Sequence, residues 1–262
     1  MHLTSRMFLS IFFILSLFIC EVLHGDIQKV SIHKLELEDC LLPKDHPLQD
    51  RLNALFENPN MFESNEHLQQ AGFLPFNRTT KPLMVASHPA IKKYLIKKFK
   101  DKVTQSKQLS NYLMRISCAR ALREFIRLNN LQHIVMPKKW LYRLPKRFSD
   151  SKTGKRTYVL IVEDMDICSG GDDPNGEVAR RYYNMDFDTL RELCIVLHHF
   201  RGLDSSLRNM PFTNQNTIAF VDTEHWSDEK RELLRHTKHY LSEDRLEYAL
   251  AVFGELREQD QR

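Results

Sequence analysis

Hydrophobic and polar positions alternate in several short stretches of the chain, and this spacing predicts β-strands. In the clearest example, the turn His88-Pro89 separates the run L-M-V-A-S from a second alternating run that ends at Phe99. A continuous apolar run at residues 158–162 predicts a buried strand. We therefore expect strands at residues 83–87, 92–99, 133–137, 140–142 and 158–162.

Other stretches repeat their apolar residues every three or four positions, which predicts helices. The longest covers residues 109–129 and carries an apolar stripe of Tyr112, Leu113, Ile116, Ala119, Leu122, Phe125 and Ile126. A second covers residues 189–200 and opens with Thr189-x-x-Glu192, the pattern of a capping box. Further helices are expected at 48–56 and over most of 233–256. Strands and helices in this order predict an α+β fold.

The first 25 residues have the pattern of an export signal. Arg6 precedes the run 7–20, in which only Ser10 and Ser16 are polar. Such a run fits the apolar part of a signal peptide and is short for a membrane span. We expect an exported protein, either secreted or held in a secretory or periplasmic compartment. No clear cleavage site follows, so an uncleaved N-terminal anchor stays open, and this segment is the one membrane contact that we expect.

Four cysteines follow the leader, namely Cys40, Cys118, Cys168 and Cys194. An even number of cysteines in an exported chain permits two disulfides, although the spacing shows no disulfide framework. Free and buried thiols are the other interpretation, above all for Cys118 and Cys194, which fall on helical patterns.

The composition is that of a globular protein, with 42% hydrophobic and 27% charged residues. Charge is distributed unevenly: residues 81–157 carry 20 Lys and Arg against three acids, whereas residues 158–262 carry 12 against 21. A basic half that faces an acidic half can enclose an anionic ligand such as a nucleotide. A nucleic acid or an anionic lipid surface fits less well, because the basic stretch lacks interleaved aromatic residues.

Candidate chemistry lies between Phe200 and Trp226. Asp204 and Asn209 form a D-x-x-x-x-N pair, and a short apolar strand then leads to a second acid, Asp222. Phosphoryl transfer requires side chains of these kinds. One carboxylate accepts the proton of the nucleophile, while an amide and a second carboxylate hold Mg²⁺ on the phosphates.

This order of residues resembles that of the protein-kinase-like phosphotransferases. The ending D-T-E at Asp222 is similar to the I-D-x-E of aminoglycoside and choline kinase-type enzymes. The resemblance implies that Asp204 is the catalytic base and that Asn209 and Asp222 bind Mg²⁺. It also implies that Glu224 is a second metal-binding or positioning carboxylate.

The same resemblance implies an ATP site. The sequence Tyr94-Leu95-Ile96-Lys97 resembles the V-A-I-K strand, so Lys97 would hold the phosphates and Glu124 on the following helix would pair with it. A register shifted by one residue would present Lys98 instead. Glu163 and Met165 follow the buried strand, at the hinge where backbone groups of a kinase meet the adenine.

The expected fold is a two-lobed kinase-like α+β fold with a truncated helical C-lobe. Its expected divisions are a signal peptide or anchor at 1–25, an N-terminal extension at 26–59, an N-lobe with hinge at 60–165 and a C-lobe at 166–262. The expected function is transfer of phosphate from ATP, with Mg²⁺, to an unknown protein or small-molecule acceptor. The sequence also departs from the family: Gly202 and Leu203 precede Asp204 where the family has His-Arg, and no glycine-rich loop precedes Lys97. These departures favour the alternative, a catalytically inactive kinase-like binding module (a pseudokinase).

Overall fold

The computed structural model describes residues 27–33, 35–58, 61, 65–76, 83–99, 104–145, 157–168, 170, 173–223 and 234–262. The leader expected at 1–25 and Glu224 lie outside the described residues. The fold is α+β, as the sequence predicts.

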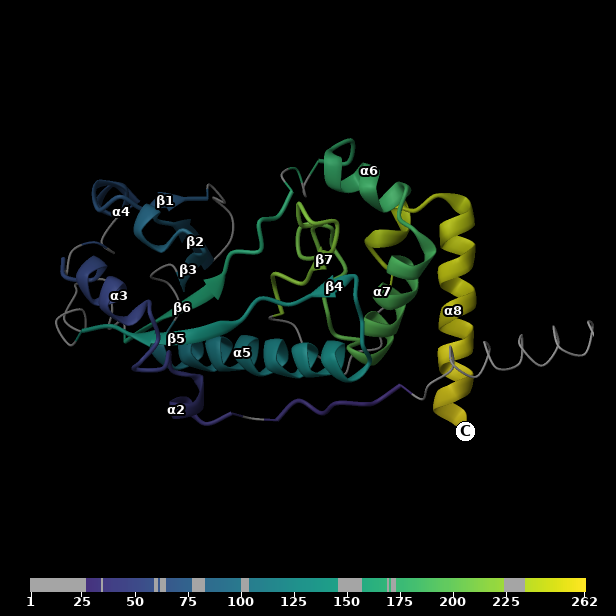
Figure 1. Ribbon diagram of the computed structural model, residues 1–262, viewed down its shortest axis with the longest axis horizontal. Coiled ribbons are helices and arrows are strands. Elements are labelled where there is room, and N and C mark those ends of the chain that lie inside the picture. Colours follow the sequence, from purple (N-terminus) through teal and green to yellow (C-terminus); the bar gives the residue numbers. More distant parts are fainter. Residues whose placement is uncertain are drawn as a thin grey trace, which may run out of the picture.

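Within these ranges the main sheet is antiparallel and has five strands in the order β1-β2-β3-β6-β5 (Figure 1). Strand β3 lies at its centre, with Lys97 opposite Val85 on one neighbour and Leu160 on the other. Strand β5 is one residue longer at each end than the sequence predicts, β6 is one residue longer at its C-terminal end, and β3 begins two residues later. The strand bounds are β1 Leu74–Pro75, β2 Leu83–Ser87, β3 Tyr94–Phe99, β5 Lys139–Arg143 and β6 Tyr158–Glu163.

The strands present alternate side chains to two different apolar cores, because successive residues of a strand point to opposite faces. Ile96 and Ile161 pack against residues of α3 (Gln49–Leu55) and α4 (Asn65–Gln70) on one face. Leu160 and Val162 pack on the other face, against α2 (Leu37–Cys40) and the first half of α5 (Gln105–Leu128). The sheet is therefore covered on both sides.

Helix α5 connects this sheet to the rest of the protein (Figure 1). It begins four residues before the predicted start, at Gln105, and ends at Leu128. Tyr112 and Ile116 belong to the core under the sheet, whereas Leu122 and Phe125 belong to the core formed by the C-terminal helices. One amphipathic helix thus fixes the sheet relative to the helical region.

The helical region contains α6 (Glu177–Tyr183), α7 (Phe187–His199) and α8 (Glu243–Gln261). It also holds a parallel pair of short strands, β4 (Ile134–Val135) and β7 (Ile218–Ala219). Helix α8 begins ten residues later than the sequence pattern suggests, because a 3-10 turn at Thr237–Tyr240 and Ser242 precede it. These elements pack around the largest apolar core of the described residues.

The capping box expected at the start of α7 is wrong. Asp186 is the N-cap, and its carboxylate accepts hydrogen bonds from the Thr189 N–H and the Thr189 hydroxyl, both at 2.8 Å. The Glu192 carboxylate instead accepts the backbone N–H groups of Gln132 and His133 at the start of β4, at 2.9 and 2.7 Å. Glu192 therefore joins α7 to the parallel strand pair.

All four cysteines after the leader are free and buried, which agrees with the thiol interpretation. Burial raises the pKa of Cys118 to about 11 and that of Cys194 to about 12. Among the helices that the structure describes, none is both long enough and apolar enough to cross a membrane.

Candidate functional site

A cavity of about 270 Å³ opens between the central strands of the sheet and the segment that follows β7. Of the residues singled out in the sequence, Lys97, Glu163 and Met165 line this cavity. They come from β3, from the end of β6 and from the segment that follows β6, and Val221 also lines the cavity. The full lining is Phe76, Val85, Leu95, Lys97, Pro137, Val162, Glu163, Asp164, Met165, Asp166, Ile167 and Val221.

Lys97 reaches the cavity because its position in β3 places its side chain on the face of the strand that lines the cavity. Leu95 and Lys97 share one face of the strand and both line the cavity, whereas Lys98 points to the opposite face and does not. The Lys97 ammonium donates a hydrogen bond to the Val221 carbonyl at 3.1 Å. This bond joins the sheet to the segment that carries Asp222.

The segment after β6 offers backbone groups to the cavity. The Glu163 carboxylate accepts the Lys138 N–H at 2.8 Å, and the Glu163 N–H donates to the Lys138 carbonyl at 3.0 Å, so both groups of Glu163 hold β5. Met165 is half-buried, and neither its N–H nor its carbonyl has a hydrogen-bond partner among the described residues. A backbone donor and acceptor that lack partners at a cavity wall are available to a ligand.

Asp204 and Asn209 are in direct contact. The Asn209 amide donates to the Asp204 carboxylate at 2.7 Å, and the Ser206 N–H donates to its other oxygen at 3.1 Å. The Asn209 carbonyl accepts the Val221 N–H at 3.0 Å, so this loop is tied to the residue before Asp222. The amide nitrogen thus orients Asp204, while the amide oxygen accepts no hydrogen bond from the residues that the structure covers.

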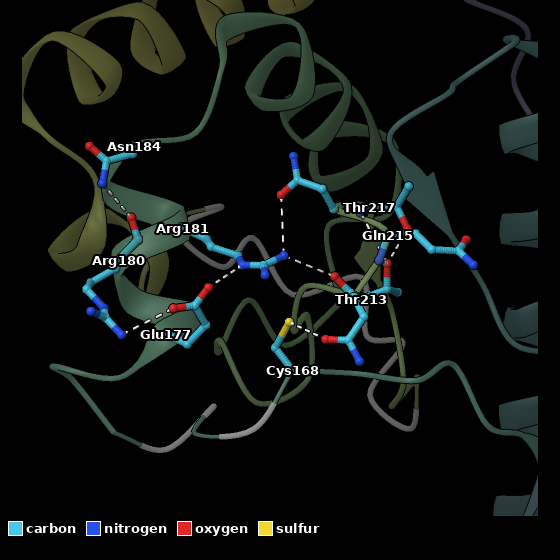
Figure 2. Close-up of polar contacts among 10 residues, drawn as sticks. Cys168, Glu177, Arg180, Arg181, Asn184, Thr213, Gln215 and Thr217 are labelled. Carbon is cyan, nitrogen blue, oxygen red and sulfur yellow. Dashed lines mark hydrogen bonds and ion pairs between the residues drawn. The ribbon is translucent and has the colours of Figure 1, made fainter.

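The hairpin before Asp222 is held by helix α6 (Figure 2). Arg181 pairs with Glu177 on its own helix at 2.8 Å and donates to the Thr213 carbonyl at 3.1 Å. The Thr213 hydroxyl in turn accepts the N–H groups of Gln215 and Thr217, each at 3.2 Å, and closes the turn. These bonds fix the position and direction of β7, and Asp222 follows this strand.

Asp222 forms an ion pair with Arg115, a residue that the sequence reasoning did not select. The Arg115 guanidinium lies 2.5 Å from one oxygen of the Asp222 carboxylate, and the two side chains are 1% and 24% exposed. Among the described residues no group of three or more His, Cys, Asp or Glu side chains could hold a metal ion. A guanidinium at this distance competes with Mg²⁺ for the same oxygen and repels it, so the arrangement fits a Mg²⁺ ligand poorly.

Glu124 does not meet Lys97. Its carboxylate bonds to Arg127 on the next turn of α5, at 2.6 and 2.9 Å, and its side chain is 46% exposed. Arg115 is the α5 residue beside the Val221–Thr223 segment, more than two turns before Glu124. The expected pairing fails because Glu124 lies on the solvent side of the helix.

Lys139 is the second functional candidate that the sequence reasoning missed. It lies at the start of β5, is 3% exposed, and donates to the Thr223 hydroxyl at 3.0 Å. Burial first, and then the neighbouring charge of Lys97, holds the pKa of Lys139 well below its ordinary value. The sequence contained a weak indication of this, because Lys139 is two residues before the apolar Leu141 and therefore lies on the same, buried face of the strand.

Arg115 had a similar signal in the sequence, because it lies three residues after Tyr112 and four before Ala119, within the apolar stripe of α5. A basic residue within an apolar stripe indicates a buried charge that needs a partner.

Compared with known proteins, the chain matches no family model and has no significant similarity to a curated protein.

Proposed function

We propose that the protein is a kinase-like nucleotide-binding module and that ATP occupies the cavity between β3, β6 and Val221. The observation that carries the proposal is the lining of this cavity. It brings Lys97 and Met165 together with the segment before Asp222, although these residues are far apart in the chain. This agrees with the order of elements that the resemblance to kinases implies, and with a two-lobed arrangement around the ligand.

The lining of the cavity suits both parts of a nucleotide. Val85, Leu95 and Val162 supply apolar walls for a flat base. The backbone N–H and carbonyl of Met165 match the acceptor and donor that adenine carries side by side. Lys97 supplies a positive charge for the phosphates. The acceptor of any transferred phosphate, protein or small molecule, is not assigned by these contacts.

Titration calorimetry of the full chain with ATP tests this proposal. We expect Lys97→Met to weaken binding by about tenfold or more, since a hydrogen bond to a charged group contributes roughly 1.5–3 kcal/mol. Lys98→Met is the matched control, because Lys98 is also buried but lies on the opposite face of β3. Binding that is lost with Lys98→Met and kept with Lys97→Met would contradict the proposal.

Phosphoryl transfer from ATP is the second candidate function, and the contact between Asn209 and Asp204 favours it. An amide that orients a half-buried carboxylate gives that carboxylate a fixed direction, as a general base requires. Asp204→Asn should then leave ATP binding unchanged and reduce ATP consumption by on the order of 10²-fold or more. If the unaltered protein binds ATP but consumes none with any acceptor mixture, the binding module alone stands.

A further inference from the structure

Three basic side chains from three different elements form hydrogen bonds to three successive residues, Val221–Thr223. Lys97 of β3 donates to the Val221 carbonyl at 3.1 Å, and Arg115 of α5 lies 2.5 Å from the Asp222 carboxylate. Lys139 of β5 donates to the Thr223 hydroxyl at 3.0 Å. The three side chains are 7%, 1% and 3% exposed, so their charges are poorly screened by water. We call Lys97, Arg115 and Lys139 the basic cluster.

The basic cluster changes what Asp222 can do. Arg115 already neutralises the carboxylate through a buried, charge-assisted hydrogen bond. To bind Mg²⁺, Asp222 would have to give up its hydrogen bond from this buried guanidinium, which costs free energy. Lys97, which lines the cavity, brings a further positive charge to the same place. A divalent cation is therefore repelled, and an anion is attracted.

We propose that the phosphates of the nucleotide bind beside Lys97 without a divalent cation, in a field that the basic cluster supplies in place of Mg²⁺. This inference rests on the proposed function, because it assumes that a nucleotide occupies the cavity. Lys97 contacts the phosphates and Arg115 acts through its charge, whereas Lys139 positions the Val221–Thr223 segment through its hydrogen bond to Thr223. The ligand class is a nucleoside di- or triphosphate in its metal-free form.

Calorimetry of the full chain with ATP in excess EDTA, and again in excess Mg²⁺, separates this inference from the proposed function. We expect binding in EDTA that is as tight as in Mg²⁺ or tighter, since free ATP carries more negative charge than its Mg²⁺ complex. Binding that occurs only with Mg²⁺ overturns the inference and keeps the proposed function. Binding under neither condition overturns both.

Asp222→Asn gives a test in which the two arrangements predict opposite signs. If Asp222 held Mg²⁺, this variant would lose most of its affinity for Mg²⁺-ATP. If the phosphates bind at Lys97 without a divalent cation, affinity in EDTA stays the same or rises severalfold, because one nearby negative charge is removed. Asp188→Asn is the matched control, since Asp188 is exposed at the start of α7, and it should change nothing.

Arg115→Gln tests the buried charge itself. It should weaken binding in EDTA by on the order of tenfold, as the loss of a close charge partner does at other sites. It should also make the remaining affinity depend more on Mg²⁺, because the positive charge beside the Asp222 carboxylate is then removed. Unchanged affinity in EDTA in folded Arg115→Gln would overturn the role of Arg115. Asp222→Asn retains the arginine and decides the question by itself if Arg115→Gln fails to fold.

Discussion

The hydroxyl of Tyr112 on helix α5 binds strand β3 at the position of Lys97. It accepts the Phe99 N–H at 3.2 Å and donates to the Lys97 carbonyl at 3.4 Å. Tyr112 is almost fully buried, and burial raises the pKa of its phenol well above the ordinary value. One side chain thus fixes the end of the strand that carries the cavity lysine to the helix that carries Arg115.

Tyr112→Phe is expected to lower the free energy of unfolding by about 1–3 kcal/mol, because it removes the partner of a buried backbone N–H. Urea denaturation followed by circular dichroism measures this change. Tyr183→Phe is the control, since Tyr183 is 56% exposed on α6, and we expect almost no effect there. Equal decreases in the free energy of unfolding for the two variants would show that the hydrogen bonds of the Tyr112 hydroxyl do not stabilise the fold.

Asp186→Ala is expected to destabilise the protein by roughly 1–2 kcal/mol, because it removes the N-cap of α7 and both bonds to Thr189. Thermal or urea denaturation measures the loss. Asp188→Ala, also an acid in the first turn of α7, removes no cap and should have a much smaller effect. A larger loss from Asp188→Ala would mean that the cap is assigned to the wrong residue.

Lys139→Met is expected to raise the free energy of unfolding near neutral pH, by on the order of 1 kcal/mol or more, because it removes an amine whose protonated form is disfavoured in the folded state by burial and by Lys97. Thr223 keeps its hydrogen bond to the Arg115 carbonyl in this variant. Lys138→Met, at a side chain that is 58% exposed, should leave stability nearly unchanged.

The pH dependence of the Lys139→Met gain has a definite sign. The pKa of Lys139 is lowered in the folded state, so between this lowered value and the ordinary value of about 10.4 the unfolded chain binds the extra proton. Stability of the unaltered protein therefore rises with pH through this window. The advantage of Lys139→Met should shrink as the pH approaches about 10. An advantage that grows with pH would contradict the lowered pKa.

The N-terminal segment bonds to the half-buried His199, which is next to the buried His198, and these two histidines should make the protein sensitive to acid. His199 Nε2 lies 3.1 Å from the Val30 nitrogen and 3.0 Å from the Val30 carbonyl oxygen, and the tautomer of the ring decides which of the two it bonds. The neighbouring His198 lies 2.8 Å from Asp260. Burial lowers the pKa of both histidines, although Asp260 partly offsets this for His198. Below the ordinary histidine pKa of about 6.5, the unfolded chain binds the protons first, so stability falls as the pH drops.

We expect a His198→Gln, His199→Gln double variant to show a flatter stability profile between about pH 7 and pH 5 than the unaltered protein. Urea denaturation at several pH values measures the two profiles. His239→Gln, at an exposed position, should keep the original slope. Parallel profiles for the double variant and the unaltered protein would show that these histidines do not carry the acid sensitivity.

Much of the local structure follows from the sequence alone, because side-chain periodicity depends only on nearest neighbours along the chain. The alternation around Lys97 predicted that Lys97 and Lys98 point to opposite faces of the strand, and the apolar stripe that includes Ile116 predicted α5. The spacing of Asp204 and Asn209 also gave a loop in which the two side chains meet at 2.7 Å. These features need no partner from elsewhere in the fold, or only one that lies a few residues away.

Only the tertiary structure decided which charges meet. The partner of Asp222 is Arg115, 107 residues earlier, and the cation beside Thr223 is Lys139 from another strand. Glu124 was chosen because it is an acid on the expected helix, but its rotation about the helix axis places it next to Arg127 and solvent. The periodicity of apolar residues predicts which face of each helix or strand is buried. The contacts between faces depend on how α5 packs against the sheet, which is a property of the whole core and not of any local pattern.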